Sequence, residues 1–176
     1  MAHIHTLPGQ HDHTASMYLF RTDFDEPKIM LHLHKKLGKY MQFGGHIELN
    51  ETPWQAVAHE LREESGYDIT QVQLLQPQLR LEFLTDSAVH PTPAIHSTHL
   101  VANDHYHTDS AYVITTNQEP AGIPGEGESS DIQLFTRSEI AALPQEQILE
   151  NVREGIFYMF DTILPNWETV TPNTFK

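Results

Sequence analysis

Carboxylates and histidines are concentrated in the stretch GGHIELNETPWQAVAHELREESGY, residues 44–67. Within it Glu60 and Glu64 are four residues apart, and Glu63 lies between them. On an α-helix, side chains at this spacing point in directions only about 40° apart. Like charges so placed destabilise a helix by roughly 0.2–0.5 kcal/mol per pair, but they become favourable when a cation lies between them. Because Mg²⁺ prefers carboxylate and phosphate oxygens, the pattern indicates a divalent metal site that acts on phosphates.

The spacing of the whole stretch decides between this interpretation and a solvated charged face with ordinary pairs to Arg62. The fixed positions read Gly45, five residues, Glu51, seven residues, then His59-Glu60-Leu61-Arg62-Glu63-Glu64-Ser65-Gly66-Tyr67. This resembles the Nudix box, written G-x5-E-x7-R-E-U-x-E-E-x-G-U, with U a bulky apolar residue. The box, residues 45–67, covers 23 of 176 residues and departs at one fixed position, where His59 replaces arginine. Residues 32–48 and the segment HYHTDSAYVI also resemble a bacterial Nudix subgroup.

Resemblance to the Nudix superfamily implies a fold, an activity and a metal. The implied fold is α/β, an α/β/α sandwich with a mixed β-sheet. The implied activity is hydrolysis of a nucleoside diphosphate linked to another moiety, with Mg²⁺ or Mn²⁺ as the cofactor. Carried onto this chain, Glu60 and Glu64 would be the main metal ligands and Glu63 a further one. The carbonyl of Gly45 would complete the shell, and Glu51 would support the metal cluster and the bound substrate.

A carboxylate must also take the proton of the attacking water. One of the box glutamates is a candidate, and so is a residue from a distant loop. In this chain Glu126 and Glu128 lie in the Gly/Pro-rich loop 119–131, and we select Glu128. The box contacts only the diphosphate, so we expect substrate specificity to come from residues 86–110 and 119–131.

His59 leaves two interpretations open. Arginine is a permanently charged, forked donor, whereas histidine offers at most two N–H groups and titrates near neutral pH. Adjacent carboxylates favour the protonated imidazole. In one interpretation His59 still orients a glutamate and takes part in catalysis. In the other the protein is a non-catalytic nucleotide-binding or regulatory module. We favour the first, because every carboxylate of the box is present.

The other histidines suggest two further kinds of contact. Alternation in residues 28–36 puts Ile29, Leu31 and Leu33 on one strand face and His32 and His34 on the other. The resemblance places His32, His34 and His46 near the cleft, where they would contact substrate phosphates, and we select His34 and His46 as binding residues. His105 and His107 share one face of a strand, a spacing compatible with Zn²⁺. Since no spacing selects further ligands, we interpret this pair as ordinary strand histidines.

The elements around the box must hold it in place. Thr52 as N-cap, Pro53 at the first helical position and Gln55 as capping-box partner predict a helix from Thr52 to Ser65, ended by Gly66. Strands are expected at residues 15–21, 28–36, 67–75, 79–85, 97–104, 105–115 and 131–136. A short helix is expected at 137–143 and a closing amphipathic helix at 145–164. We expect residues 1–13 to be a flexible tail and residues 14–176 a single domain.

Composition restricts the partners. The formal net charge of −14 disfavours a nucleic-acid polymer, since an acidic surface repels phosphate backbones. The chain has no cysteine, which excludes disulfides and thiolate metal sites, and no long apolar run that predicts a membrane span. We therefore expect a soluble cytoplasmic protein with a small-molecule nucleotide substrate. The resemblance also allows a homodimer.

Overall fold

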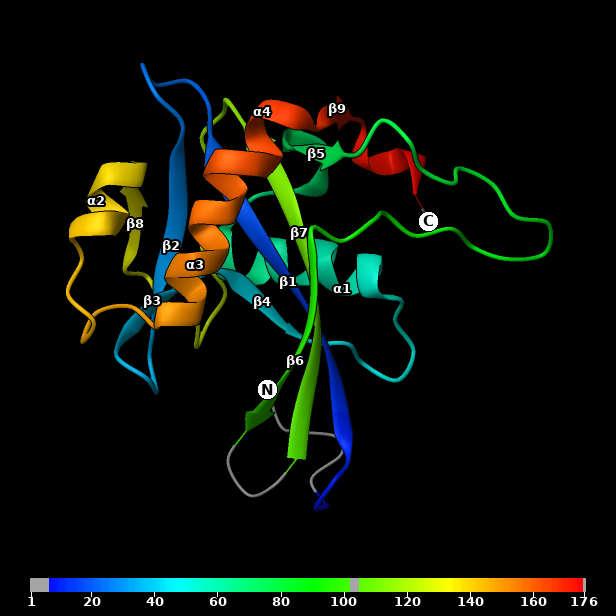
Figure 1. Cartoon of the computed structure of the whole chain (residues 1–176), viewed down its shortest axis with the longest axis horizontal. Coiled ribbons are helices and arrows are strands. Elements are labelled where there is room, and N and C mark those ends of the chain that lie inside the picture. The colour runs from blue at the N-terminus through cyan, green and yellow to red at the C-terminus, as the bar shows by residue number, and fades with distance from the viewer. Residues whose placement is uncertain (1–6, 102–104, 176) are drawn as a thin grey trace.

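The computed structural model describes residues 7–101 and 105–175, and in them helices cover both faces of a mixed β-sheet (Figure 1). Two long parallel strands form its centre, β1 (His11–Arg21) and β7 (His105–Thr116), paired along the whole length of β1. The main path runs β3-β2-β1-β7-β5-β9, while β4 pairs with β1, β6 with β7 and β8 with β2. The other strands are β2 (Lys28–His34), β3 (Lys39–Met41), β4 (Phe43–His46), β5 (Gln73–Gln76), β6 (Ile95–Val101), β8 (Ile132–Phe135) and β9 (Glu168–Val170).

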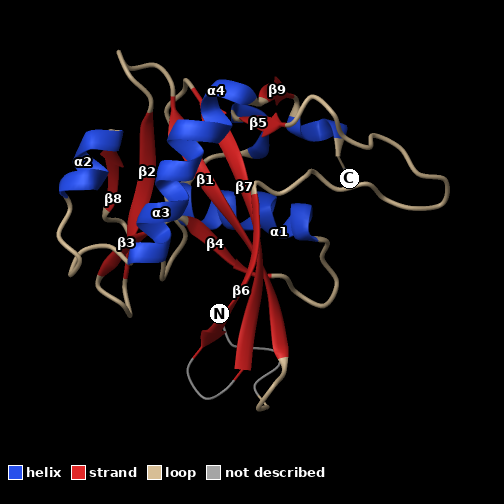
Figure 2. Cartoon of the chain, viewed as in Figure 1, coloured by secondary structure: helices blue, strands red, loops and turns tan. Residues whose placement is uncertain are grey.

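The helices form two layers (Figure 2). On one face lies α1 (Pro53–Glu60), continued by a π-helical turn, η1 (Leu61–Ser65). The other face is covered by α3 (Glu150–Tyr158), which continues through the π-turn η3 (Met159–Ile163) into α4 (Leu164–Asn166). At the edge of the sheet lies α2 (Arg137–Ala142), and two short 3-10 turns are η2 (Ile69–Gln71) and η4 (Pro172–Thr174). None of the helices in the described ranges is long and apolar enough to cross a lipid bilayer.

The alternation of β1 explains the two layers. Met17 and Leu19 pack in the cluster that contains Trp54, Val57 and Leu61 on the α1 side. Tyr18 and Phe20 pack in a second cluster with Ile148, Val152 and Ile156 on the α3 side. Successive residues of a strand point to opposite faces, so a strand apolar on both faces must lie between two helical layers. The expected α/β/α sandwich is thus confirmed.

The start of α1 follows the prediction, and its end does not. The Gln55 N–H donates to Thr52 Oγ1 over 3.3 Å, and the Thr52 N–H donates to Gln55 Oε1 over 2.9 Å, which is the expected capping box. Gly66 ends the helical segment in the left-handed conformation at φ 77°. The segment is not one α-helix to Ser65, however, because residues 61–65 form a π-turn. Such turns occur often at functional sites.

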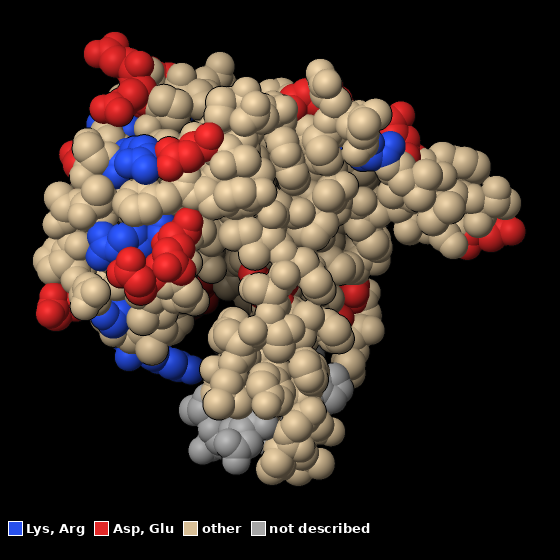
Figure 3. Space-filling model, in the orientation of Figure 1, with Lys and Arg blue, Asp and Glu red and all other residues tan. Residues whose placement is uncertain are grey.

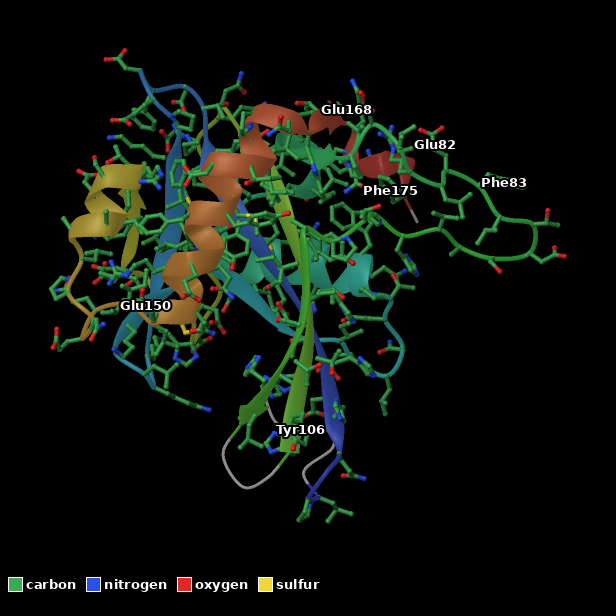
Figure 4. All side chains as sticks on the ribbon, in the orientation of Figure 1. Glu82, Phe83, Tyr106, Glu150, Glu168 and Phe175 are labelled. Carbon is green, nitrogen blue, oxygen red and sulfur yellow. The ribbon has the colours of Figure 1, made fainter. Side chains whose placement is uncertain are left out.

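Other expectations are also corrected. The strand expected at 67–75 is limited to β5, because residues 69–71 form the 3-10 turn η2, and the closing helix expected from residue 145 begins only at Glu150. β1 begins at His11, so residues 11–13 belong to a strand paired with β7 and not to a flexible tail 1–13. Residues 79–85 form no strand but lie in a long projecting loop, on which Figure 4 labels Glu82 and Phe83. The apolar residues of this loop have no neighbouring strand to pair with, and Leu79 is 95% exposed. His3 and His5, expected in the tail, lie outside the described residues.

The loop 117–131 packs against the end of the box. The Gly125 N–H donates to the Glu63 carbonyl over 2.7 Å, and the Gly122 N–H donates to the Gly66 carbonyl over 2.9 Å. A Cβ at Gly66 would lie 2.7 Å from the Gly122 carbonyl oxygen, so the close approach requires glycine. These backbone contacts place the loop that carries Glu126 and Glu128 against the box.

A substitution at Gly44 tests how tightly β4 packs on β1. Gly44 has φ 139°, and a Cβ there would lie 2.5 Å from the Ala15 carbonyl oxygen and from Ser16 Cα. We expect Gly44→Ala to lower the free energy of unfolding by about 3 kcal/mol or more, because backbone strain adds to a backbone clash. Urea denaturation measures it.

The matched control is Gly38→Ala. Gly38 also has a positive φ, 61°, but nothing lies within 4 Å of an added Cβ. Its cost should be limited to roughly 1–2 kcal/mol of backbone strain. Equal losses for the two variants would contradict a close approach at Gly44.

Candidate active site

The glutamates of the box gather where the helical segment meets β4. Glu60 ends α1, and Glu63 and Glu64 lie on the π-turn that follows. Glu60 and Glu64 are buried, at 3% and 8% exposure, whereas Glu63 is exposed. The Gly44 N–H of β4 donates to Glu64 Oε2 over 2.7 Å. This hydrogen bond fixes the last carboxylate of the helical segment to the sheet.

The two buried carboxylates resist ionisation. Burial is the main cause that raises the pKa of Glu64 to about 8; the hydrogen bond from Gly44 opposes it, and the charges of Glu60, Glu128 and Glu63 add to it. Burial likewise raises the pKa of Glu60 to about 7, with Glu63 and Glu128 adding to the effect. Within the described residues, Glu60 Oε1 has no hydrogen-bond partner. Buried carboxylate oxygens that crowd together with an unused acceptor are the donor set that a hard divalent cation fits.

His59 joins two of the glutamates. Its Nε2 lies 3.0 Å from Glu63 Oε1, and its Nδ1 lies 3.3 Å from Glu51 Oε1. Burial by itself lowers the pKa of His59, but the hydrogen bond to Glu63 and the charges of Glu63, Glu51 and Glu60 outweigh it, so the pKa is raised. Both ring nitrogens donate only in the protonated imidazole. His59 therefore has the charge and the two donors with which to hold Glu51 and Glu63 in place.

Arg62 does not take over the role of the missing arginine. Its guanidinium pairs with Asp68 over 2.8 Å, beyond the helical segment. The expected alternative, a charged face with Glu60 or Glu63 paired to Arg62, is not what the structure has. Glu51 instead receives a weak contact from the Glu48 N–H at 3.4 Å, which closes the turn before α1.

The histidines of β2 face the carboxylates, as their alternation predicted. His32 Nδ1 lies 3.7 Å from Glu64 Oε1, and burial followed by the charge of His34 lowers the pKa of His32 to about 4. His32 is consequently neutral at pH 7 and does not neutralise Glu64. Burial and then Lys36 lower the pKa of His34, while its own hydrogen bond and the Glu128 charge oppose them. His32, expected near the cleft but not selected as a binding residue, thus lies beside Glu64.

Glu128 and His46 lie in different surroundings. The charge of Glu128 acts on Glu60, Glu64 and His34, so loop 117–131 places it at the carboxylate cluster.

His46 contacts Asp12 and His107, with its Nε2 3.4 Å from Asp12 Oδ2 and its ring stacked edge-on to His107. Gly45 lies on β4 opposite Ala15. Neither Asp12 nor its contact with His46 was expected from the sequence, because no local spacing connects them.

The buried glutamates predict a pH effect on protein stripped of divalent cations. A glutamate in the unfolded chain titrates near 4.5, but Glu60 and Glu64 retain protons up to about 7 and about 8 in the folded state. Between these values the folded state binds more protons, so stability falls as pH rises. Their contribution is complete below pH 4.5 and lost above about 8. Thermal melts across this window measure the slope.

The variant Glu64→Gln separates this effect from general titration. A glutamine cannot ionise, so the fall in melting temperature across the window should be clearly smaller than in the unmodified chain. Glu126→Gln, at an exposed position, should keep the full slope. The interpretation fails if Glu64→Gln and Glu126→Gln melt with the same pH dependence.

Comparisons with known proteins agree with this geometry. A model of the NUDIX domain matches residues 12–154. An 8-oxo-dGTP diphosphatase of Proteus vulgaris is 40% identical over 67 residues, which are 38% of this chain and 51%, about half, of that protein. A NUDIX-family hydrolase from Clostridium perfringens is 28% identical, with a TM-score of 0.71 over 85% of this chain and 96% of that one.

A Nudix hydrolase from M. smegmatis shares the fold at a TM-score of 0.61 and 15% identity, over 88% of each chain. The Nudix-box pattern in the sequence, the α/β/α sandwich of the structure and the match to the NUDIX domain model agree with one another. Together they support a hydrolase. The chain belongs to the Nudix family.

Proposed function

We propose that this chain is a metal-dependent pyrophosphohydrolase that cleaves a nucleoside diphosphate linked to another moiety. The observation that carries the proposal is the pair of buried carboxylates, Glu60 and Glu64, the second of which accepts the Gly44 N–H of β4. Carboxylates are rarely removed from water without a compensating charge. The Proteus vulgaris relative, named as acting on 8-oxo-dGTP, supports a phosphorylated nucleoside as substrate.

Glu60 and Glu64 would hold Mg²⁺ or Mn²⁺, with Glu63 as a further ligand and the Gly45 carbonyl as another. When bound, the cation supplies positive charge that offsets the diphosphate and acidifies water. Glu63 is exposed and tied to His59, so it is the carboxylate with freedom to reach either the cation or the substrate. Oxygen donors of this kind suit Mg²⁺ better than a soft metal.

Glu128 is our candidate for the residue that accepts the proton of the attacking water. Its charge raises the pKa of both buried glutamates, which supports its selection over Glu126. Loop 117–131 is also tied to β2, since Lys35 Nζ donates to the Gly127 carbonyl over 2.6 Å. His34 lies on β2 beside this loop, and we propose that it contacts the substrate. His46 contacts Asp12 and His107, and we propose no phosphate contact for it.

A pocket of about 400 Å³ borders the turn before α1 and is our candidate for the moiety beyond the diphosphate. Its walls come from the box turn, at Glu48, Leu49 and Pro53, and from the β6–β7 pair, at His96 and Thr108. Ligand pockets of about this size suit a small molecule. The expectation that residues 86–110 contribute to specificity is consistent with this position.

Hydrolysis of a nucleotide panel tests the proposed activity. We expect the purified chain to release phosphorylated products with Mg²⁺ or Mn²⁺, and to lose activity with EDTA until the metal is restored. Glu64→Gln should lower kcat by on the order of 100-fold or more, since it removes the negative charge of a proposed metal ligand while the amide oxygen can still accept the Gly44 N–H. Binding of a nucleotide without turnover under all these conditions would favour the non-catalytic alternative.

Two loop variants provide a matched comparison within the same assay. Glu128→Gln should lower kcat with little effect on KM, because it removes a proton acceptor and leaves the loop contacts in place. Glu126→Gln changes an exposed carboxylate two residues away and should leave kcat within about twofold. Equal effects of the two would contradict the role of Glu128.

His59 variants test whether the histidine has taken the place of arginine. His59→Arg keeps a cation that can pair with Glu51 and Glu63, so we expect activity within a few-fold of the unmodified chain. His59→Leu leaves both glutamates without this donor and should lower kcat about 10-fold or more. A large gain for His59→Arg would show instead that the histidine impairs catalysis.

A further inference from the structure

A second group of metal-ligating side chains lies on the strands and not on the box helix. The ligand atoms of Asp12, His105 and His107 all lie within 4.8 Å of one another. His46 joins them, with its Nε2 3.4 Å from Asp12 Oδ2 and its ring centroid 4.9 Å from that of His107. We call these four residues the histidine–aspartate cluster. It draws on three separate parts of the sequence.

The backbone pairing explains why these residues meet. β1 and β7 run in parallel with Asp12 opposite His107, so their side chains lie next to each other on one face. His105 and His107 are two residues apart on β7 and therefore share that face. β4 pairs with β1 so that His46 lies opposite Thr14. Thr14 is two residues from Asp12, so the two side chains are on the same face of β1. The ligands are thus carried by adjacent strands of one sheet.

The cluster is buried among strands whose sequences contain almost no lysine or arginine. Asp12 is 1% exposed, His105 4% and His46 8%. Residues 7–20 and 87–116, which include β1 up to Phe20, β6 and β7, contain no Lys or Arg. The face of the projecting β6–β7 strands seen in Figure 3 accordingly shows no basic side chain. Burial of a carboxylate next to imidazoles favours ligands that bind a cation together, because a bound cation offsets the cost of removing the carboxylate from water.

We propose that the histidine–aspartate cluster binds a divalent transition metal of the Zn²⁺ class, at a site separate from the box glutamates. Three imidazoles and one carboxylate are the donors that zinc takes in four-coordinate sites, whereas Mg²⁺ takes oxygen donors. The two sites therefore differ in the metal they select. Glu60 and Glu64 offer oxygens alone, and the cluster offers mainly nitrogens.

The geometry requires only small adjustments. With bonds of about 2.0–2.1 Å, the ligand atoms of a tetrahedral zinc are roughly 3.4 Å apart. His46 Nε2 and Asp12 Oδ2 are already at 3.4 Å, and the upper limit of 4.8 Å for the remaining ligand atoms is within reach of a rotation of the rings. His99 on β6 lies next to His107, with ring centroids 5.4 Å apart, and borders the site.

A metal here would connect β1, β4 and β7 where the sheet projects beyond its helices (Figure 1). Asp109, two residues beyond His107, already connects β1 and β7 by accepting hydrogen bonds from Thr14 at 2.7 Å and Ser16 at 2.6 Å. The site is therefore placed to stabilise the strands, and its occupancy should be visible without any measurement of hydrolysis. Metal that binds only the folded state raises stability with concentration.

Calorimetric titration of the full chain with Zn²⁺ tests the proposal. The protein is first treated with a chelator, and Mg²⁺ is then added in excess to occupy the box glutamates. We expect one Zn²⁺ per chain and a rise in melting temperature. His107→Ala and Asp12→Asn should each weaken binding by about 100-fold or more. Co²⁺ in place of Zn²⁺ should give the visible absorption bands of a tetrahedral site, which His107→Ala removes.

Three control variants identify the site. His96→Ala changes an exposed histidine on β6 that contacts Ser110, and it should leave Zn²⁺ affinity unchanged. Glu64→Gln and the double variant His3→Ala, His5→Ala should also leave it unchanged. The proposal is overturned if the unmodified chain binds no Zn²⁺, or if His107→Ala and Asp12→Asn bind it as well as the unmodified chain. It is also overturned if Glu64→Gln or the double variant His3→Ala, His5→Ala abolishes binding. Far-UV circular dichroism confirms that each variant is folded.

Discussion

The burial of Glu60 and Glu64 is the constraint that the surrounding structure has to meet. Removing a carboxylate from water costs several kcal/mol even after the protein relaxes. The hydrogen bond from Gly44 offsets part of this cost for Glu64, and the raised pKa values show that the rest is not offset by the protein. The cost is sustained because the backbone around the two residues is fixed at several points.

Those fixed points come from different parts of the chain. The capping box at Thr52 starts α1, and Gly66 ends the π-turn where Gly122 packs against it. The Gly125 N–H binds the Glu63 carbonyl within the same turn. Gly44 allows β4 to approach β1 closely, which brings its N–H to Glu64. Gly44 and Gly66 therefore have the same effect, since each permits a backbone approach that a Cβ would block.

The sequence predicted the helix start, the glutamate cluster and the two faces of β2, because each depends on spacing along one segment. It did not predict the π-turn at 61–65, since the pattern of an α-helix continues through those residues. Residues 79–85 have the composition of a strand but no partner strand, and strand formation depends on a partner that only the tertiary fold supplies. His46 was expected at the phosphates, yet the β1–β4 register turns it toward Asp12, a residue that no spacing connects with it.

β4 is the element through which the two candidate sites meet. Gly44 donates to Glu64 from this strand, and His46, two residues later, contacts Asp12. Metal bound by the histidine–aspartate cluster would hold β4 against β1 and so fix the N–H that positions Glu64. The two metals would differ in chemistry, because nitrogen donors retain zinc while oxygen donors leave Mg²⁺ partly hydrated and exchangeable. A tightly held metal in the histidine–aspartate cluster would stabilise the strands. The metal at the box glutamates would exchange, because that site must also admit a charged substrate.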